Sequence, residues 1–179
     1  MRKRKFRVNA LTGDGLDELI AAVESEQKRL KDGVPELVRK AAERGKELAE
    51  ANFATAEYDG ATGEISVIAA PDGDSAAIVR ASGEKAAFVE FGTGVKFPDN
   101  YPDPQGRGLR GKYGQGHGAN PEGWHYKGEP GSHGKEETGG KWKGYIHTYG
   151  NPANAPVYES KKKLLDETQS LVDEVFNRD

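Results

Sequence analysis

The sequence contains no cysteine, which excludes a disulfide scaffold, thiolate zinc, iron–sulfur ligation and thiol catalysis. It is also poor in large apolar residues, because Leu, Ile, Val and Phe make up only 32 of the 179 residues. No run approaches the roughly 18 apolar residues of a membrane-spanning helix. We therefore expect a small hydrophobic core in a folded domain with large unpacked parts.

Charge is distributed unevenly along the chain. There are 26 basic and 29 acidic residues, a formal net charge of −3, and the remainder of the chain is markedly acidic once the first seven residues are set aside. A basic arm at 1–9 is either a solvated terminus or a segment that faces DNA phosphates. No apolar stretch follows it, so it does not resemble a secretory signal. The basic residues of this arm are Arg2, Lys3, Arg4, Lys5 and Arg7.

Hydrophobic periodicity predicts an α+β fold, and the length suggests one domain over 1–179. Two amphipathic helices are expected at the N-terminus. The first is expected to end at Gly33 and the second to begin at Pro35, where a missing N–H is tolerated. A third amphipathic pattern begins at Pro156 and closes the chain.

A small, mostly antiparallel sheet is expected in the middle of the sequence. Segments 64–69 and 76–81 flank a Pro-Asp-Gly-Asp turn and predict a hairpin. Segments 124–127 and 141–148 alternate aromatic and polar residues, and we expect them to extend the hairpin sheet. Between them and the hairpin, 83–91 favours a short helix.

Glycine and proline dominate the stretch from residue 92 to residue 150, which holds 16 of the 24 glycines. Two segments within it, 96–122 and 129–140, lack any core periodicity. Loops of this length are usually functional or disordered. We expect them to extend from the domain and to become ordered on assembly.

Tests for catalytic and cofactor sites give no assignment. The Gly-x-Gly-x-x-Gly match at 106–111 follows prolines instead of a strand, which argues against a dinucleotide site. The histidines at 117, 125, 133 and 147 lack metal-ligand spacing, and no serine lies in a Gly-x-Ser-x-Gly elbow. We expect no cofactor, no metal, no catalytic residue and no enzyme activity, although a hydrolase that uses paired carboxylates stays open as an alternative.

Aromatic and basic residues are interleaved in the glycine-rich stretch. Such residues either stack on single-stranded bases or anchor a protein interface, and the acidic remainder of the chain favours protein contact. A nucleic-acid-binding module that uses the basic arm and these aromatics is the alternative function. For the aromatics at 124–145, packing within the sheet is a further possibility. The interface candidates are Phe97, Tyr101, Arg107, Arg110, Tyr113, Trp124, Tyr126, Trp142 and Tyr145.

The segment Gly-Glu-Lys-Ala-Ala-Phe-Val-Glu-Phe-Gly-Thr-Gly at 83–94, followed by a variable loop, Gly-Trp-His-Tyr at 123–126 and a closing helix, resembles the head–tail joining family of tailed bacteriophages. Departures are the Asn-Pro-Ala-Asn-Ala-Pro-Val-Tyr run at 151–158 and the long loops. The signature residues are Phe88, Phe91, Gly92 and Thr93.

Two residue types in this signature predict local structure. Phe88 and Phe91 lie three apart and are expected to anchor the short helix on the hairpin sheet, while Gly92 permits a left-handed exit. Glu90 is a surface carboxylate, a partner of a local backbone N–H, or half of an intersubunit ion pair.

The resemblance implies a virion structural protein of the neck, also termed a tail-completion protein, that is assembled in the host cytoplasm. It implies a sixfold or twelvefold homo-oligomeric ring between the head connector or head-closure protein and the tail terminator or tail-tube protein. Genomic DNA would pass through the ring without sequence-specific binding, and no membrane is involved. A ring also fits the composition, because contacts between subunits offset what a small core cannot supply.

Overall fold

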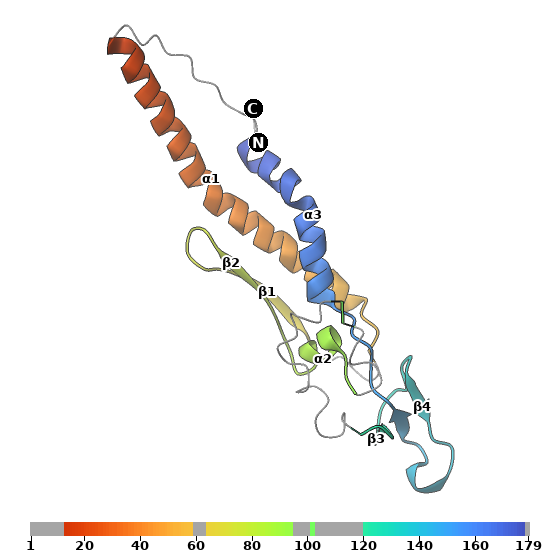
Figure 1. Cartoon of the computed structure of the whole chain (residues 1–179). Helices are drawn as coiled ribbons and strands as arrows, with labels where there is room; N and C mark the ends of the chain where they lie inside the picture. Colours follow the sequence, from red (N-terminus) through yellow and green to blue (C-terminus); the bar gives the residue numbers. More distant parts are fainter. Residues whose placement is uncertain (1–12, 59–63, 95–100, 103–119, 178–179) are drawn as a thin grey trace.

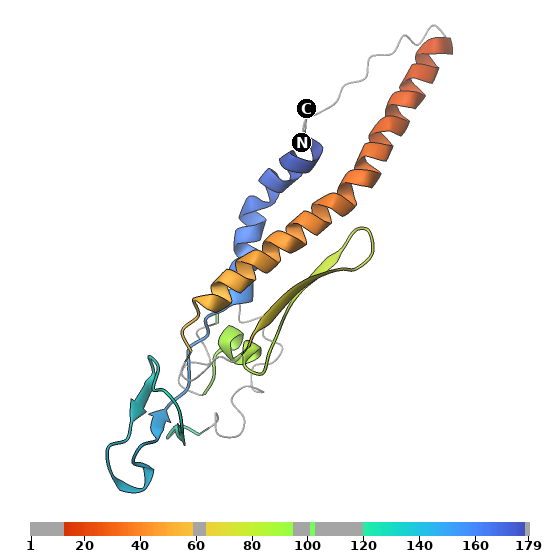
Figure 2. The same ribbon diagram turned by 180° about the vertical axis from the view of Figure 1, so that it is seen from behind.

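The computed structural model describes residues 13–58, 64–94, 101–102 and 120–177. Helices and small antiparallel sheets confirm the predicted α+β class (Figure 1). Seen from both sides, α1 and α3 run side by side, the β1–β2 hairpin lies along α1, and the remaining strands lie at the far end (Figures 1 and 2). The elements are α1 (Gly13–Ala54), β1 (Ser66–Pro71), β2 (Ala77–Ser82), α2 (Ala86–Phe91), β3 (Trp124–Tyr126), β4 (Gly134–Glu136), a 3-10 turn (Gly140–Trp142), β5 (Ile146–Thr148) and α3 (Pro156–Phe176).

The prediction of two N-terminal helices is wrong, because α1 is one helix of 42 residues with Pro35 inside it. Gly33 lies under the ring of Phe176, where a Cβ atom would collide with the ring. Arg29 donates from Nη1 to the carbonyl of Phe176 over 2.7 Å. An interior proline costs a helix about 3 kcal/mol. Arg29 before the expected break and Lys40 after it bind Phe176 and Glu174 at the end of α3, and these contacts offset that cost.

Polar contacts hold α1 and α3 together along their shared length. Arg44 donates to both carboxylate oxygens of Glu167, over 2.7 and 3.0 Å, and these hydrogen bonds lower the pKa of Glu167. A lowered pKa means that the pair stabilises the fold at neutral pH and that this contribution is lost as the pH falls through that pKa. Asn52 donates to Ser160 Oγ over 2.9 Å at the other end of the seam.

The core is small, as the composition predicts. Its buried centre consists of Ala49 and Phe53 from α1, Val67 from β1 and Val89 from α2. Val89 is fully buried, whereas Phe88 and Phe91 are only half-buried. Val89, which lies between the two phenylalanines, therefore fills the core, while Phe91 lines a pocket together with residues of β2.

The hairpin is confirmed within two residues of its predicted bounds, and the closing helix begins at Pro156 as predicted. The strands that follow the hairpin in the sequence do not extend the hairpin sheet. They form a separate sheet in the order β3–β5–β4, all antiparallel, and β4 lies inside the segment 129–140 that was expected to be a loop. Alternation of residue types predicts a strand but does not specify which sheet it joins.

We predict that Gly33→Ala destabilises the protein by about 0–2 kcal/mol, because overpacking of the added methyl against Phe176 costs about 1–3 kcal/mol and helix propensity returns about 1 kcal/mol. Helix propensity alone would stabilise the same variant by about 1 kcal/mol. In a Phe176→Ala background the collision is absent, so Gly33→Ala should become stabilising. Urea unfolding of the four proteins measures the coupling, and stabilisation in both backgrounds would contradict the packing described.

Candidate functional site

The signature segment is joined to the residues that lead into α3. Gly92 leaves α2 at a φ of +78°, and a side chain there would meet the backbone of Asn151 and Ala153. The Thr93 N–H donates to the Asn151 carbonyl over 2.8 Å, and the Asn151 N–H donates to Thr93 Oγ1 over 2.9 Å. The left-handed exit predicted for Gly92 is confirmed. It brings two segments almost 60 residues apart into backbone contact.

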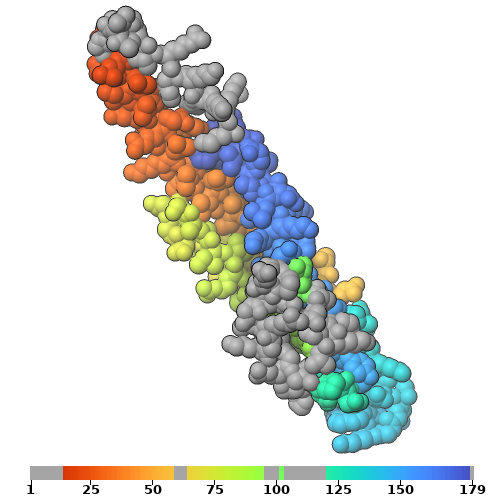
Figure 3. Space-filling model, in the orientation of Figure 1, coloured from red at the N-terminus to blue at the C-terminus, as the bar shows by residue number. Residues whose placement is uncertain are grey.

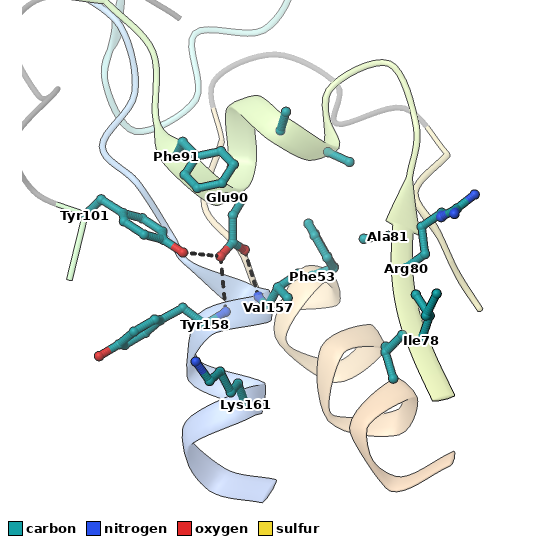
Figure 4. Close-up of a pocket in the computed structure, with 13 residues that line it drawn as sticks. Phe53, Ile78, Arg80, Ala81, Glu90, Phe91, Tyr101, Val157, Tyr158 and Lys161 are labelled. Carbon is teal, nitrogen blue, oxygen red and sulfur yellow. Dashed lines mark hydrogen bonds between the residues drawn. The ribbon is translucent and has the colours of Figure 1, made fainter. Parts of the chain in front are cut away.

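Glu90 points from α2 to the first residues of α3 (Figure 4). Its carboxylate is buried and accepts hydrogen bonds from the backbone N–H of Val157 over 2.7 Å and of Tyr158 over 3.1 Å. The hydroxyl of Tyr101 donates to the same group over 2.9 Å. The surface-carboxylate alternative for Glu90 is therefore wrong. It partners backbone N–H groups, but these are 67 and 68 residues away in sequence.

This carboxylate replaces a local helix cap. Ala155, the residue before α3, has a left-handed φ of 51° and offers no side-chain oxygen. Pro156 has no N–H, so the first free donors of the helix are those of Val157 and Tyr158. A negative charge at a helix N-terminus also interacts favourably with the helix dipole. Glu90 thus satisfies the start of α3 from another element.

A pocket of about 460 Å³ opens beside this junction, between β2, α2 and the start of α3. Phe53, Phe91 and Val157 give it an apolar lining. Lys161 lines it from α3 and Arg80 from β2, and in Figure 4 the Arg80 side chain extends away from Glu90. The pocket is therefore mostly apolar, with cations at its border and the hydrogen-bonded carboxylate of Glu90 in its lining.

The β3–β5–β4 sheet, which we call the far sheet, carries a row of stacked aromatic rings. The His125 and Trp142 rings stack with centroids 4.5 Å apart and planes within 5°, and His125 also lies 4.7 Å from His147. Trp142 keeps 38% of its surface exposed, and Lys141 Nζ lies 4.8 Å from its ring centroid. These rings hold together a sheet of three-residue strands and leave an aromatic, cationic face.

The other end of the molecule is the N-terminal half of α1, opposite the far sheet (Figure 3). Its apolar side chains Leu16, Ile20 and Val23 are 59%, 48% and 50% exposed. The amphipathic pattern predicts a helix here, and an amphipathic helix ordinarily places its apolar side against its own domain. What could have indicated otherwise is the length of the helix, since neither the hairpin nor α3 extends that far.

The predicted interface residues are distributed as follows. Tyr101 is buried against Glu90, while Trp124, Tyr126, Trp142 and Tyr145 belong to the far sheet and its turn. The remaining candidates lie outside the described residues: Phe97, Arg107, Arg110, Tyr113, Arg2, Lys3, Arg4, Lys5 and Arg7.

Within the described ranges, no three His, Asp or Glu side chains are placed to hold a metal ion. None of the helices there has a stretch long and apolar enough to cross a bilayer. No family model, curated protein or solved structure matches the chain.

We predict that Glu90→Gln lowers the free energy of unfolding by about 2 kcal/mol, because an amide offers one acceptor oxygen to two N–H donors of α3. Glu159→Gln is the matched control, since Glu159 lies exposed in the same first turn and should change stability by only about 0.5 kcal/mol. Urea unfolding measures both variants. Equal effects would show that the cap adds nothing beyond surface charge.

Proposed function

We propose that this chain is a structural protein of the phage neck, which assembles into a ring between head and tail around the DNA channel. The observation that carries the proposal is the exposed apolar stripe on the N-terminal half of α1. Its partners would be further copies of the chain, the head connector on one side and the tail terminator or tail tube on the other.

The stripe lies on a helix that extends beyond its own domain. The last residue of α3, Phe176, contacts α1 at Gly33 and Arg29, so residues 13–28 continue past these contacts for about 24 Å. We call this segment the arm. A helix of such length is marginal in water unless another surface covers its apolar side. The arm therefore favours a protein that completes its packing by assembly.

The arm also continues the side of α1 that the domain buries. At about 100° per residue, Leu16, Ile20 and Val23 fall on the same side of the helix as the buried Leu48 and Ala49. One apolar face is thus covered in the C-terminal half of α1 and bare in the arm. Apolar residues in this pattern are typical of a contact with a partner.

The position of the signature segment supports the same function. Its central residues cap α3 or pair with the chain before α3, so they maintain the architecture of the subunit. Residues with such roles are what a resemblance to a structural family would preserve. The run at 151–158, which departs from that family, is the segment that pairs with the signature.

The proposal predicts that a phage encoding this chain, once its gene is deleted, accumulates DNA-filled heads and separate tails. Purified chain added to such a lysate should restore joined, infectious particles, because the missing ring can then form. Electron microscopy and plaque titres measure joining, with an unrelated protein as the control. Normal particles from the deletion would refute the proposal.

The aromatic row on the far sheet favours a second candidate function, the binding of single-stranded nucleic acid. Trp142 is exposed beside Lys141, and Lys127 Nζ lies 5.3 Å from the Tyr145 ring centroid. Exposed rings with nearby cations stack on bases and contact phosphates.

This candidate predicts that Trp142→Ala weakens the binding of a labelled single-stranded oligonucleotide roughly tenfold, since one stacked base contributes about 1–3 kcal/mol. Affinity should also fall steeply between about 50 and 200 mM salt. Tyr126→Ala is the control, because the Tyr126 hydroxyl is engaged by donating to the Glu129 carbonyl in the turn after β3. Fluorescence anisotropy measures the binding of the oligonucleotide. If it detects no salt-dependent binding, this candidate function is excluded.

A further inference from the structure

The arm combines an apolar stripe with charges of one sign, all of them negative in residues 14–26. Leu16, Ile20 and Val23 follow the i, i+4, i+7 spacing by which helices fill apolar grooves. Asp17 and Glu24 lie along one edge of this stripe, and residues 14–26 contain five acidic residues and no basic one. Among the described residues, neither Asp17 nor Glu24 has an ion-pair partner. The arm is thus an apolar ligand with a negative edge.

The pocket beside Glu90 has the complementary properties. Its lining includes Phe53, Val157 and Ile78, and Ile78 is 46% exposed. Arg80 and Lys161 border it, and within the part of the chain that the structure describes neither forms an ion pair. Cations beside exposed apolar side chains suit a helix with an apolar face and acidic edges.

The arm cannot reach the pocket of its own chain. Ile20 in the arm and Phe53 in the pocket lie on the same uninterrupted helix, 33 residues apart. At 1.5 Å per residue this separation is about 50 Å. Any contact between the two surfaces must therefore join different copies of the chain.

We infer that the arm of one copy docks into the pocket of a second copy, with Leu16, Ile20 and Val23 against its apolar lining and the acidic edge facing Lys161, while Arg80 lies at the opposite border of the pocket. The inference rests on the proposed function, because it names the contact between neighbouring subunits of the ring. The occupant is a second copy of this chain, since both complementary surfaces belong to the same sequence.

Such a contact is heterologous, because different surfaces of the two copies meet. An open row of copies then keeps one free arm at one end and one free pocket at the other until the assembly closes, and heterologous contacts generate rings when the rotation closes. Direct pairing of two arms through residues 14–26 would instead set acidic residues against acidic residues. Charge therefore favours arm-to-pocket docking over arm-to-arm pairing.

The test uses two full-length variants, each defective in one surface. Ile20→Asp places a charge in the stripe of the arm, and the double variant Arg80→Glu with Lys161→Glu reverses the charge of the pocket. Mass photometry should show rings for the wild type and monomers for each variant alone, with self-association weakened roughly tenfold or more. Mixing the two variants should give heterodimers, because one intact arm still meets one intact pocket.

Matched controls carry the same chemical changes outside the two surfaces. Ala21→Asp lies on the opposite side of the arm, and Lys162→Glu follows Lys161 but does not line the pocket. Both should form rings like the wild type. Circular dichroism establishes that each variant is folded. If the pocket variant unfolds, Glu24→Lys alone must weaken assembly, and Lys161→Glu in the same chain must partly restore it.

Three outcomes would overturn the inference. They are a wild type that stays monomeric, rings formed by Ile20→Asp, and dimers formed by the pocket variant alone, which would indicate arm-to-arm pairing. The proposed function fails separately. If rings and joined phage particles persist with every variant, only the docking contact is wrong, whereas joined particles that lack the chain altogether refute the neck role.

Discussion

The hydrogen bonds of one buried carboxylate determine how the parts of this chain meet. Glu90 belongs to α2, yet it satisfies the first free N–H groups of α3 and accepts a further hydrogen bond from Tyr101. Helix N-termini attract anions because their N–H groups and dipole point outward. Here the anion is supplied by the chain itself. The start of α3 is thereby fixed against α2, and the direction of α3 along α1 follows from that attachment.

Apolar residues are scarce in the sequence, and they are divided between a small buried centre and an exposed stripe. Ala49, Phe53, Val67 and Val89 suffice for one compact centre. The stripe of Leu16, Ile20 and Val23 lies outside this centre, on the part of α1 that none of the other described helices and strands covers. Exposure of this kind is unfavourable for an isolated chain and becomes favourable when a partner covers the surface. In the assembly that we propose, a partner would cover the apolar residues that the subunit leaves exposed.

Local signals in the sequence were enough to predict the elements whose ends are determined locally. The turn at 71–74 predicts the hairpin, Pro156 predicts the start of α3, and Gly92 predicts the end of α2. The break expected at Gly33 and Pro35 did not occur, because the ring of Phe176, over 140 residues away, occupies the space that the glycine leaves. Tertiary contact overrode a local preference.

The candidate site shows the same division. Glu90 is part of the signature segment, but its hydrogen-bond partners lie 67 and 68 residues away. These partners are backbone N–H groups, and a pattern of side chains in the sequence does not predict them. The separation of the two sheets was equally hidden, since alternation at 124–126 and 146–148 gives strand type without giving a partner strand. The spacing of Phe88 and Phe91 indicates a shared side of α2, but it does not indicate that Val89 is the fully buried residue of that helix.

The contacts along α3 depend on one another, from Glu90 at its start to Phe176 at its end. Glu90 fixes the start of α3, and α3 then runs along α1 until its last turn reaches Arg29 and Gly33. Gly33 and Pro35 form the intrinsically weakest part of α1, and the contacts of Phe176 lie at that point. An α1 broken there would leave the arm free to swing, and a swinging arm would lose more entropy on docking. By fixing α3, the Glu90 cap therefore helps to keep α1 unbroken at Gly33 and Pro35. It thereby contributes to the direction in which the arm extends.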